Sequence, residues 1–328
     1  MNGGDCERGD TGINGRERMK LNGIHHITAI TADAQQNVDF YADLLGLRLV
    51  KKTVNFDAPD VYHLYYGDEV GNPGSILTFF EFPGVPLGRA GAGMVSRIAW
   101  RVTAEALDFW SERLRGAGIA VERAASSLRF VDPEGLELEL AVDDGADEPL
   151  RANHPDIAPE HALRGFAGVR VHADLPRIDG GFLASLGFAP GDANLYSLAG
   201  DSRHAFYAYD ACPPEERPER PLQGAGTVHH IALATPPEEH AAWRERVLEA
   251  GGFPTPIIDR QYFRSIYFRE PSGVLFELAT IGPGFTVDEP AETLGDALRL
   301  PPQYEHLREQ LERRLTPLRN PRTAVGVS

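Results

Sequence analysis

The sequence predicts an α+β protein built from four βαβββ modules, which pair into two curved, barrel-like sheets with their helices outside. One pattern, a strand, a helix and then further strands, recurs four times along the 328 residues. The first strands of the first and fourth copies carry the same histidine pair, in GIHHITAI and GTVHHIAL. The second and fourth copies close on similar turns, DPEGLELEL and EPSGVLFEL. Because one such module leaves sheet edges unpaired, the modules are expected to pair.

The first copy runs from about residue 21 to 83. Its opening strand is IHHITAI. The segment AQQNVDFYADLLG then predicts a helix, with Val38, Tyr41, Leu44 and Leu45 on one apolar stripe. Three strand-like runs follow, RLVKKTVNF, VYHLYYG and SILTFFEF, which complete the module.

The second copy, from about residue 92 to 142, repeats this order with VSRIAWRV, the helix EALDFWSERLRGAG and the runs IAVERA, LRFVD and LELELAV. The third copy, about 165 to 210, is weaker and reads AGVRVHA, GGFLASLG, LYSLAG and HAFYAYD. The fourth, about 226 to 280, is clear again, with VHHIALAT, the helix EEHAAWRERVLEAGG, IDRQYFRSIYF and VLFELAT.

The expected domain organisation follows from these copies. It consists of a flexible leader at 1–20, modules one and two at 21–142, a linker at 143–162, modules three and four at 163–285, and a C-terminal helix and tail at 286–328. The linker is rich in Asp, Pro and Ala and lacks apolar periodicity. In the tail, Tyr304, Leu307, Leu311 and Leu315 have helical spacing, which predicts a helix docked outside or, as the alternative, one that binds a partner.

Composition restricts the classes of partner. The 32 basic and 48 acidic residues give a net charge of -16, which argues against nucleic acid as a partner. Neither a signal peptide nor an apolar run long enough for a membrane span is found, so a cytoplasmic protein is expected. The two cysteines, Cys6 and Cys212, suit neither a disulfide framework nor a Cys-based metal site. Any metal would be held by histidines and carboxylates.

A metal site is predicted from the two doublets and one acidic residue. Aligning the closing turns matches Gly135 with Gly273, and therefore Glu139 with Glu277. Glu277 is the polar residue of VLFEL, a strand otherwise fit for burial, and a buried carboxylate needs an ionic partner or a metal. Two histidines with one carboxylate suit Fe, Mn, Ni or Zn and form the facial triad of non-haem iron oxygenases.

Strand alternation implies that one histidine of each doublet faces the metal. The pair His26 and His230 would share its side with Thr28 and an alanine, and the pair His25 and His229 with two isoleucines. Register alone leaves both open, but small and polar neighbours suit a wet site better, which favours His26 and His230.

The same reasoning predicts a single centre and a particular pairing of modules. The corresponding positions of copy two, Arg97 and Glu139, and of copy three, near Arg170 and Val171, offer no second set of ligands. Modules one and four should therefore pair, because any other pairing separates the two doublets. A site built between two subunits remains the alternative.

Over about residues 21 to 318 the chain resembles the vicinal oxygen chelate superfamily (the glyoxalase, bleomycin resistance and extradiol dioxygenase fold), and within it the hydroquinone-type ring-cleaving dioxygenases. LNGIHHITAI, YHLYYGDEVGNPGSILTFFEFPG, GTVHHIALAT and DRQYFRSIYFREPSGVLFELAT carry the resemblance. It implies Fe(II), in some members Mn(II), bound by His26, His230 and Glu277. It also implies functional residues around the ion, which map onto His25, Thr28, His229, Arg260 and Tyr267.

The activity implied by the resemblance is ring cleavage of hydroquinone- or catechol-type aromatic diols, with both atoms of dioxygen inserted. The expected partners are thus a small aromatic diol and dioxygen, with no nucleic acid and no membrane, and a homo-oligomer remains open. One alternative is a glyoxalase-like isomerase or thiol transferase, which tends to use a fourth ligand; Thr78 aligns with Glu277, so that carboxylate is missing. Another is a small-molecule-binding or sequestering protein of the same fold, which would hold no metal tightly.

Overall fold

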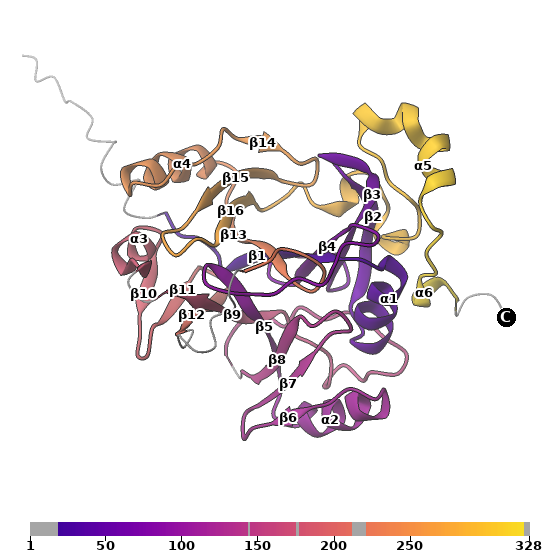
Figure 1. The fold of residues 1–328 in the computed structure, drawn as a ribbon, viewed down its shortest axis with the longest axis horizontal. Coiled ribbons are helices and arrows are strands. Elements are labelled where there is room, and N and C mark those ends of the chain that lie inside the picture. The colour runs from indigo at the N-terminus through magenta and orange to yellow at the C-terminus, as the bar shows by residue number, and fades with distance from the viewer. Residues whose placement is uncertain (1–18, 144, 175–176, 212–220, 325–328) are drawn as a thin grey trace, which may run out of the picture.

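The computed structural model describes residues 19–143, 145–174, 177–211 and 221–324. Nearly all of the predicted leader at 1–20, and both cysteines, lie outside these ranges. Figure 1 shows two curved sheets stacked against each other, with α2, α3, α4 and α5 around the periphery. Each sheet has eight strands. The predicted α+β class, with paired modules and outer helices, is confirmed.

The first sheet combines modules four and one. Its order is β14 (Ile258–Asp259), β15 (Arg264–Arg269), β16 (Leu275–Thr280), β13 (Val228–Thr235), β1 (Ile24–Thr31), β4 (Ile76–Glu81), β3 (Ala58–Gly67) and β2 (Arg48–Asn55). The first strands of the two modules, β1 and β13, pair antiparallel at its centre. The last strand of each module then lies parallel to its first strand. The pairing predicted from the two histidine doublets is therefore confirmed.

The second sheet combines modules three and two in the same arrangement. Its order is β10 (Phe188–Pro190), β11 (Leu195–Ala199), β12 (His204–Ala211), β9 (Phe166–Ala173), β5 (Met94–Val102), β8 (Glu137–Val142), β7 (Ser127–Val131) and β6 (Glu122–Arg123). β5 and β9 pair antiparallel at its centre, as β1 and β13 do in the first sheet.

The first predicted helix changes type along its length. It starts as α1 (Ala34–Val38), where Asp33 accepts a hydrogen bond from the Gln36 amide, and continues as the π-helix η2 (Asp39–Leu44). Its last amide, at Leu45, bonds to the Phe40 carbonyl five residues earlier. The wider turn leaves Leu44 half-buried, although it was placed on the apolar stripe.

The other helices are α2 (Ala106–Gly116), α3 (Gly180–Ser185), α4 (His240–Glu249), α5 (Arg308–Arg314) and α6 (Pro321–Ala324), with short 3₁₀ turns η4 (Phe285–Val287), η5 (Ala291–Thr293) and η6 (Pro302–Leu307). The tail helix expected from the sequence is thus split into η6 and α5. Leu311 and Leu315 are buried in the main core, so this segment packs against the protein. Among the described residues, no helix has the length and apolar character needed to cross a membrane.

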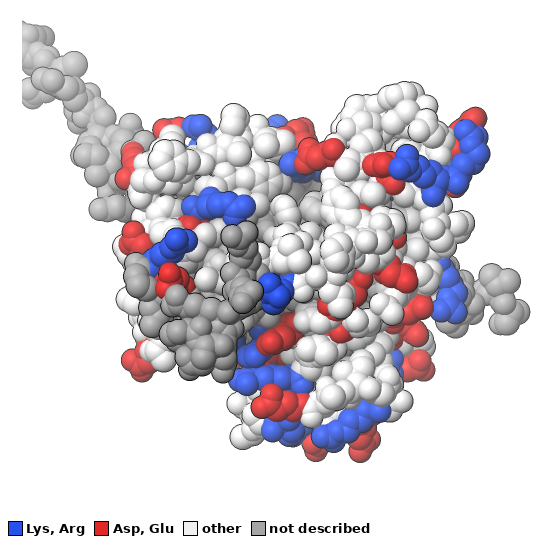
Figure 2. All heavy atoms as spheres, in the orientation of Figure 1, with Lys and Arg blue, Asp and Glu red and all other residues white. Residues whose placement is uncertain are grey.

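The main core runs through both sheets and their helices. Its largest buried side chains include Trp100, Trp110 and Trp243, from modules two and four. On the face seen in Figure 2, acidic and basic side chains are interspersed and no large area carries one sign. Residues 145–162 of the predicted linker also pack inward, since Leu150 and Ile157 are buried and Asp147 lies 3.0 Å from Arg101. The role of this segment as a linker remains a prediction.

Two buried acids tie neighbouring modules together. Asp132, at the turn before β8, accepts hydrogen bonds from the amides of Glu134 and Leu136 and from the Tyr41 hydroxyl of module one, at 2.9 Å. Glu270, at the matching turn of module four, accepts from the Tyr209 hydroxyl of module three, at 3.0 Å. Both acids are almost fully buried, so each tyrosine meets a hydrogen-bonding need that water cannot reach.

Replacing Tyr41 by Phe should lower the free energy of unfolding by about 1–3 kcal/mol, because it leaves a buried Asp132 oxygen without its partner. Urea denaturation followed by circular dichroism measures this change. Tyr66→Phe is a matched control: its ring is equally buried, but its hydroxyl has no hydrogen-bond partner among the described residues. An equal loss in both variants would contradict the proposed tie between modules one and two.

Candidate metal centre

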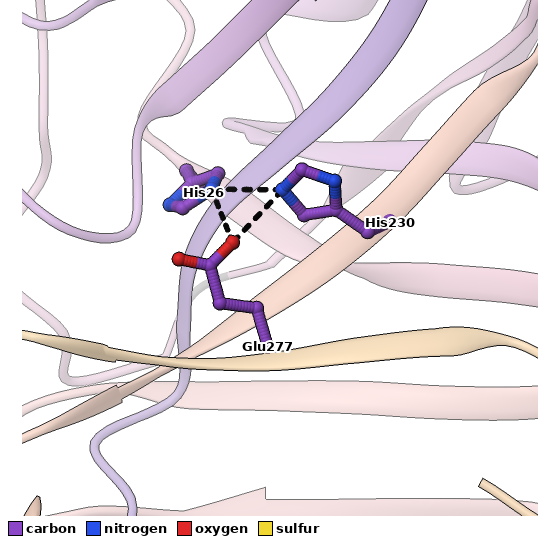
Figure 3. Close-up of side chains that lie close together, drawn as sticks. All are labelled: His26, His230 and Glu277. Atoms are coloured by element: carbon purple, nitrogen blue, oxygen red, sulfur yellow. Dashed lines mark hydrogen bonds and ion pairs between the residues drawn. The ribbon is translucent and has the colours of Figure 1, made fainter. Parts of the chain in front are cut away.

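Three ligand-type side chains meet on the inner face of the first sheet. His26 comes from β1, His230 from β13 and Glu277 from β16, and all three are buried. Glu277 Oε2 lies 3.2 Å from His26 Nε2 and 2.9 Å from His230 Nε2, and the two Nε2 atoms are 3.2 Å apart. Figure 3 shows the two rings and the carboxylate directed at one another. One chain therefore supplies the whole cluster, although its histidines lie 204 residues apart in sequence.

Two β-bulges shape the cluster. Along the β1 and β13 pair, Ile24 faces Leu233 and His26 faces Ala232, so His25 is the extra residue of a bulge. Further along, Thr28 faces His230 and Ala29 faces Val228, which makes His229 the extra residue of a second bulge. Bulges re-aim side chains and suspend the strict alternation of a strand. The expectation that adjacent histidines must face opposite sides is therefore wrong at these two positions.

The bulges let the first histidine of each doublet support the second. His25 Nδ1 lies 3.0 Å from His26 Nδ1, and His229 Nδ1 lies 2.8 Å from His230 Nδ1. Burial, followed by the neighbouring His26, lowers the pKa of His25 to about 3. Burial, followed by His230, lowers the pKa of His229 to about 4. Both rings are thus neutral near pH 7, and a hydrogen bond at Nδ1 fixes the orientation of the next ring and leaves its Nε2 facing the cluster.

Glu277 has an oxygen that fits a metal ligand. Its side chain is fully buried, and Oε1 accepts a hydrogen bond from the Ser265 hydroxyl at 2.5 Å. Oε2 makes no hydrogen bond of suitable geometry, although both histidine Nε2 atoms are close. Burial opposes ionisation of Glu277, but His26 and His230 together outweigh it and hold its pKa well below the usual range. A buried, charged oxygen facing two imidazole nitrogens is the donor set that a divalent transition metal prefers.

A cavity of about 340 Å³ opens beside the cluster. Six of the eight residues singled out from the sequence line it: His26, Thr28, His229, His230, Arg260 and Tyr267. Its apolar wall consists of Phe56, Phe80, Phe82, Phe263 and Leu275. The volume lies in the range of small-molecule sites, and the mixture of aromatic wall and few polar groups is typical of them.

Arg260 and Tyr267 form a polar pair on this wall. Arg260 Nε donates to the Tyr267 hydroxyl at 3.3 Å, and Nη1 donates to Asp57 at 3.2 Å. The guanidinium also lies over the Tyr267 ring, 5.4 Å from its centre. Burial, followed by the Glu277 charge, raises the pKa of Tyr267 above its usual range, so the phenol keeps its proton.

Thr78 occupies the position that a fourth carboxylate would take. It faces Thr28 across β1 and β4, as Glu277 faces Ala232 across β13 and β16. Its hydroxyl lies 3.0 Å from that of Thr28 and 2.7 Å from His63 Nε2. Glu81, three residues on, accepts a hydrogen bond from the Ala34 amide at the other face of the strand. The described residues thus bring three metal-ligand groups together at this position.

The second sheet shows what replaces the cluster there. Arg97 and Glu139 take the positions of His230 and Glu277, because Ala99 faces Glu139 as Ala232 faces Glu277. Glu139 lies 3.7 Å from Arg97 and 3.8 Å from Arg170 in loose ion pairs. Gly168 faces Ala99 in the second sheet as His26 faces Ala232 in the first, so Gly168 is the counterpart of His26. The counterpart inferred from the sequence, near Arg170 and Val171, is therefore two to three residues away from the true position.

Sequence reasoning missed part of the cavity wall. Tyr65, Asn55 and His63 line it, and none of the three was among the candidate functional residues. Residues 63 and 65 are two apart on β3 and therefore lie on the same face of the strand. This spacing in VYHLYYG was the sequence signal that could have placed both side chains in one wall. Nothing in the sequence places β3 beside the doublets, because that position depends on the strand order of the folded sheet.

The sequence matches the family model of the Glyoxalase/Bleomycin resistance protein/Dioxygenase superfamily over residues 23–140 and 184–278. It is 41% identical to Bacillus subtilis MhqA, provisionally named a ring-cleaving dioxygenase, over 92% of this chain and 100% of that protein. It is 34% identical to the chlorohydroquinone/hydroquinone 1,2-dioxygenase of Sphingobium indicum, over 90% of this chain and 96% of that protein. The crystal structure of a Bacillus subtilis protein provisionally named a dioxygenase is similar with a TM-score of 0.83 and 40% identity, covering 92% of this chain and 99% of the other.

Glu277→Gln should weaken binding of a divalent transition metal by about 100-fold or more, since it removes the anionic ligand while keeping the side-chain shape. Metal content after gel filtration, together with calorimetric titration of Mn(II), measures the loss. Glu139→Gln is the matched control, because this residue holds the same strand position in the second sheet. Loss of metal from the Glu139 variant, or full retention by the Glu277 variant, would rule out the cluster as the metal site.

Proposed function

The chain belongs to the Glyoxalase/Bleomycin resistance protein/Dioxygenase superfamily and is an enzyme of the ring-cleaving dioxygenase class, and we propose that it opens hydroquinone- or catechol-type aromatic diols at an Fe(II) centre. The observation that carries this proposal is the cluster of His26, His230 and Glu277 at the wall of an aromatic-lined cavity. Mn(II) is the alternative ion. The relatives' names support the reaction class and, for the Sphingobium indicum enzyme, hydroquinones as substrates.

The ligand set suits this chemistry. His26, His230 and Glu277 form the two-histidine, one-carboxylate arrangement that would hold a divalent ion and leave some of its coordination positions free. When bound, such an ion brings an aromatic hydroxyl and dioxygen to one centre and lets electron density pass from the ring to oxygen. Because Thr78 replaces a fourth carboxylate, room remains for both reactants.

The cavity supports a single aromatic ring as the substrate. Its volume of about 340 Å³ suits a small ligand, and Phe80, Phe82 and Phe263 offer faces and edges for ring contacts. Asn55 adds a polar group to the wall; its Oδ1 already accepts from the Asp57 amide, which leaves its amino group as the donor for a ligand.

Three side chains are placed to handle protons and negative charge. His229 lines the cavity and is neutral; because a ligating His230 keeps its proton on Nδ1 and donates it to His229 Nδ1, the His229 Nε2–H remains as a donor to a substrate oxygen. Tyr267 keeps its proton and can donate a hydrogen bond to an oxygen that gains negative charge. Arg260, held by Asp57 and Tyr267, adds a fixed positive charge beside it.

Two alternative functions have weaker support. A glyoxalase-like isomerase or thiol transferase would favour a fourth protein ligand, and Thr78 stands at that position. A binding protein without a metal would gain nothing from Glu277 Oε2, a buried charged oxygen that lacks a hydrogen bond. The ring-cleaving proposal accounts for both features.

Anaerobically Fe(II)-loaded protein should consume dioxygen with hydroquinones or catechols, and Glu277→Gln should lower the rate to background because the metal is lost. An oxygen electrode gives the rate, and mass spectrometry with ¹⁸O₂ should find both atoms in the ring-opened product. The Glu139→Gln protein should match the unmodified enzyme. Fully loaded protein that takes up no oxygen with any diol would refute the activity.

The two histidines of the first doublet should have different roles. His26→Ala should remove the metal, because it deletes a ligand atom. His25→Ala should retain the metal but lower kcat by about 10- to 100-fold, because the ring that orients His26 is gone. Metal content and turnover, measured on the same preparations, separate these effects. Equal metal loss in both variants would argue against the division of roles.

A further inference from the structure

A continuous chain of hydrogen bonds runs along the cavity wall away from the cluster of His26, His230 and Glu277. The Thr28 and Thr78 hydroxyls are 3.0 Å apart, and Thr78 Oγ1 lies 2.7 Å from His63 Nε2. His63 Nδ1 in turn lies 3.0 Å from the Tyr65 hydroxyl. Thr28, His63 and Tyr65 line the cavity, while Thr78 joins them from a fully buried position.

The strand register gives this chain two distinct ends. Thr28 faces His230 on one side and Thr78 on the other, so its hydroxyl belongs to the metal end of the cavity. Tyr65 faces Thr78 from β3, which lies two strands beyond β1. With about 4.8 Å between neighbouring strands, Tyr65 and Thr28 start from backbones roughly 10 Å apart.

His63 makes the chain directional. Burial, followed by His26 and His230, holds the pKa of His63 well below its usual value, so the ring is neutral and donates from one nitrogen while accepting at the other. Burial likewise keeps the proton on Tyr65 by raising the pKa of its phenol. When Tyr65 donates to Nδ1, His63 Nε2 donates to Thr78 and Thr78 donates to Thr28. The Thr28 hydrogen is then left to donate into the cavity, and the Tyr65 oxygen is left to accept.

This polarity matches a ring with one ionised oxygen and one intact hydroxyl on opposite sides. The ionised oxygen, at the metal end, needs a donor, which Thr28 supplies. The intact hydroxyl, across the ring, needs an acceptor, which Tyr65 supplies. A catechol has its two oxygens on neighbouring carbons, so both would lie at the metal end and neither would reach β3.

We propose that the Tyr65 hydroxyl, oriented by His63 and Thr78, accepts a hydrogen bond from the second hydroxyl of a para-diol and makes the pocket selective for para-diols. This inference rests on the proposed function and adds the recognition residue for the distal hydroxyl. Tyr65 contacts the substrate, whereas His63 is a positioning residue, because both of its nitrogens are engaged within the chain.

The test compares hydroquinone, its monomethyl ether 4-methoxyphenol, and catechol in the Fe(II)-loaded enzyme. The ether keeps the ring and the metal-binding oxygen but cannot donate from its far side. In Tyr65→Phe, kcat/KM for hydroquinone should fall about tenfold or more relative to catechol, and the preference for hydroquinone over the ether should disappear. His63→Phe, which keeps an aromatic ring but breaks the chain, should reduce the same preference for hydroquinone over the ether.

Tyr66→Phe is the control, because this neighbour on β3 has a buried hydroxyl without a partner among the described residues and does not line the cavity. It should preserve every ratio. Anaerobic calorimetry of hydroquinone and 4-methoxyphenol binding to loaded protein repeats the comparison without turnover, and thermal unfolding checks the fold of each variant.

The outcomes separate the two proposals. Unchanged ratios in both Tyr65→Phe and His63→Phe, or an equal fall for hydroquinone and catechol in Tyr65→Phe, would overturn the role of Tyr65 while leaving the dioxygenase proposal intact. An absence of oxygen uptake with every diol would instead refute the dioxygenase proposal. The binding comparison would then still decide whether Tyr65 recognises the distal hydroxyl, and equal affinity for hydroquinone and the ether would count against it.

Discussion

The burial of one carboxylate, that of Glu277, is the constraint on which the site depends. A charge without water is tolerated in a protein interior only when cations, strong donors or a metal compensate it. Ser265 satisfies one oxygen, and two imidazoles from different modules converge on the other. The bulges at His25 and His229 make that convergence possible, because each gives a ligand ring a supporting neighbour on the same side of the strand. The convergence of Ser265 and the two imidazoles therefore stabilises the buried charge of Glu277. The cavity lies directly beside these groups.

The second sheet indicates that this arrangement is an addition to the fold and not a requirement of it. Its central strands keep both bulges, at Ser96 and Ala167, and its last module-two strand keeps Glu139 in the place of Glu277. Arginines surround that carboxylate, so the charge is balanced by ion pairs that also reach partly exposed surface. The same backbone thus supports two solutions to one buried charge. Only the solution with neutral nitrogens offers a site for a metal, because guanidinium groups cannot act as ligands.

Much of this could be predicted from particular residues. The repeated doublets and the matched closing turns gave the fold class, and the separation of the doublets required modules one and four to pair. The bulges could not be predicted, because a bulge is a relation between two strands and leaves no mark on either one alone. The chain from Thr28 to Tyr65 was missed for a similar reason, since its four members come from three strands whose order exists only in the folded sheet. The π-helical turn after Val38 arises from hydrogen bonds that apolar spacing does not report.

The seam between β1 and β13 also has a consequence for biosynthesis. A chain emerging from the ribosome completes modules one and two before β13 and β9, the partners of β1 and β5 at the centre of each sheet, have been made. Until then β1 and β5 each have one unpaired edge, and unpaired strand edges are the parts of a sheet most prone to mispairing. Tyr41 and Asp132 already join these two modules, so the early half can fold against itself and hold its edges in place. A metal held by His26, His230 and Glu277 would be bound last, because His230 and Glu277 belong to the final module.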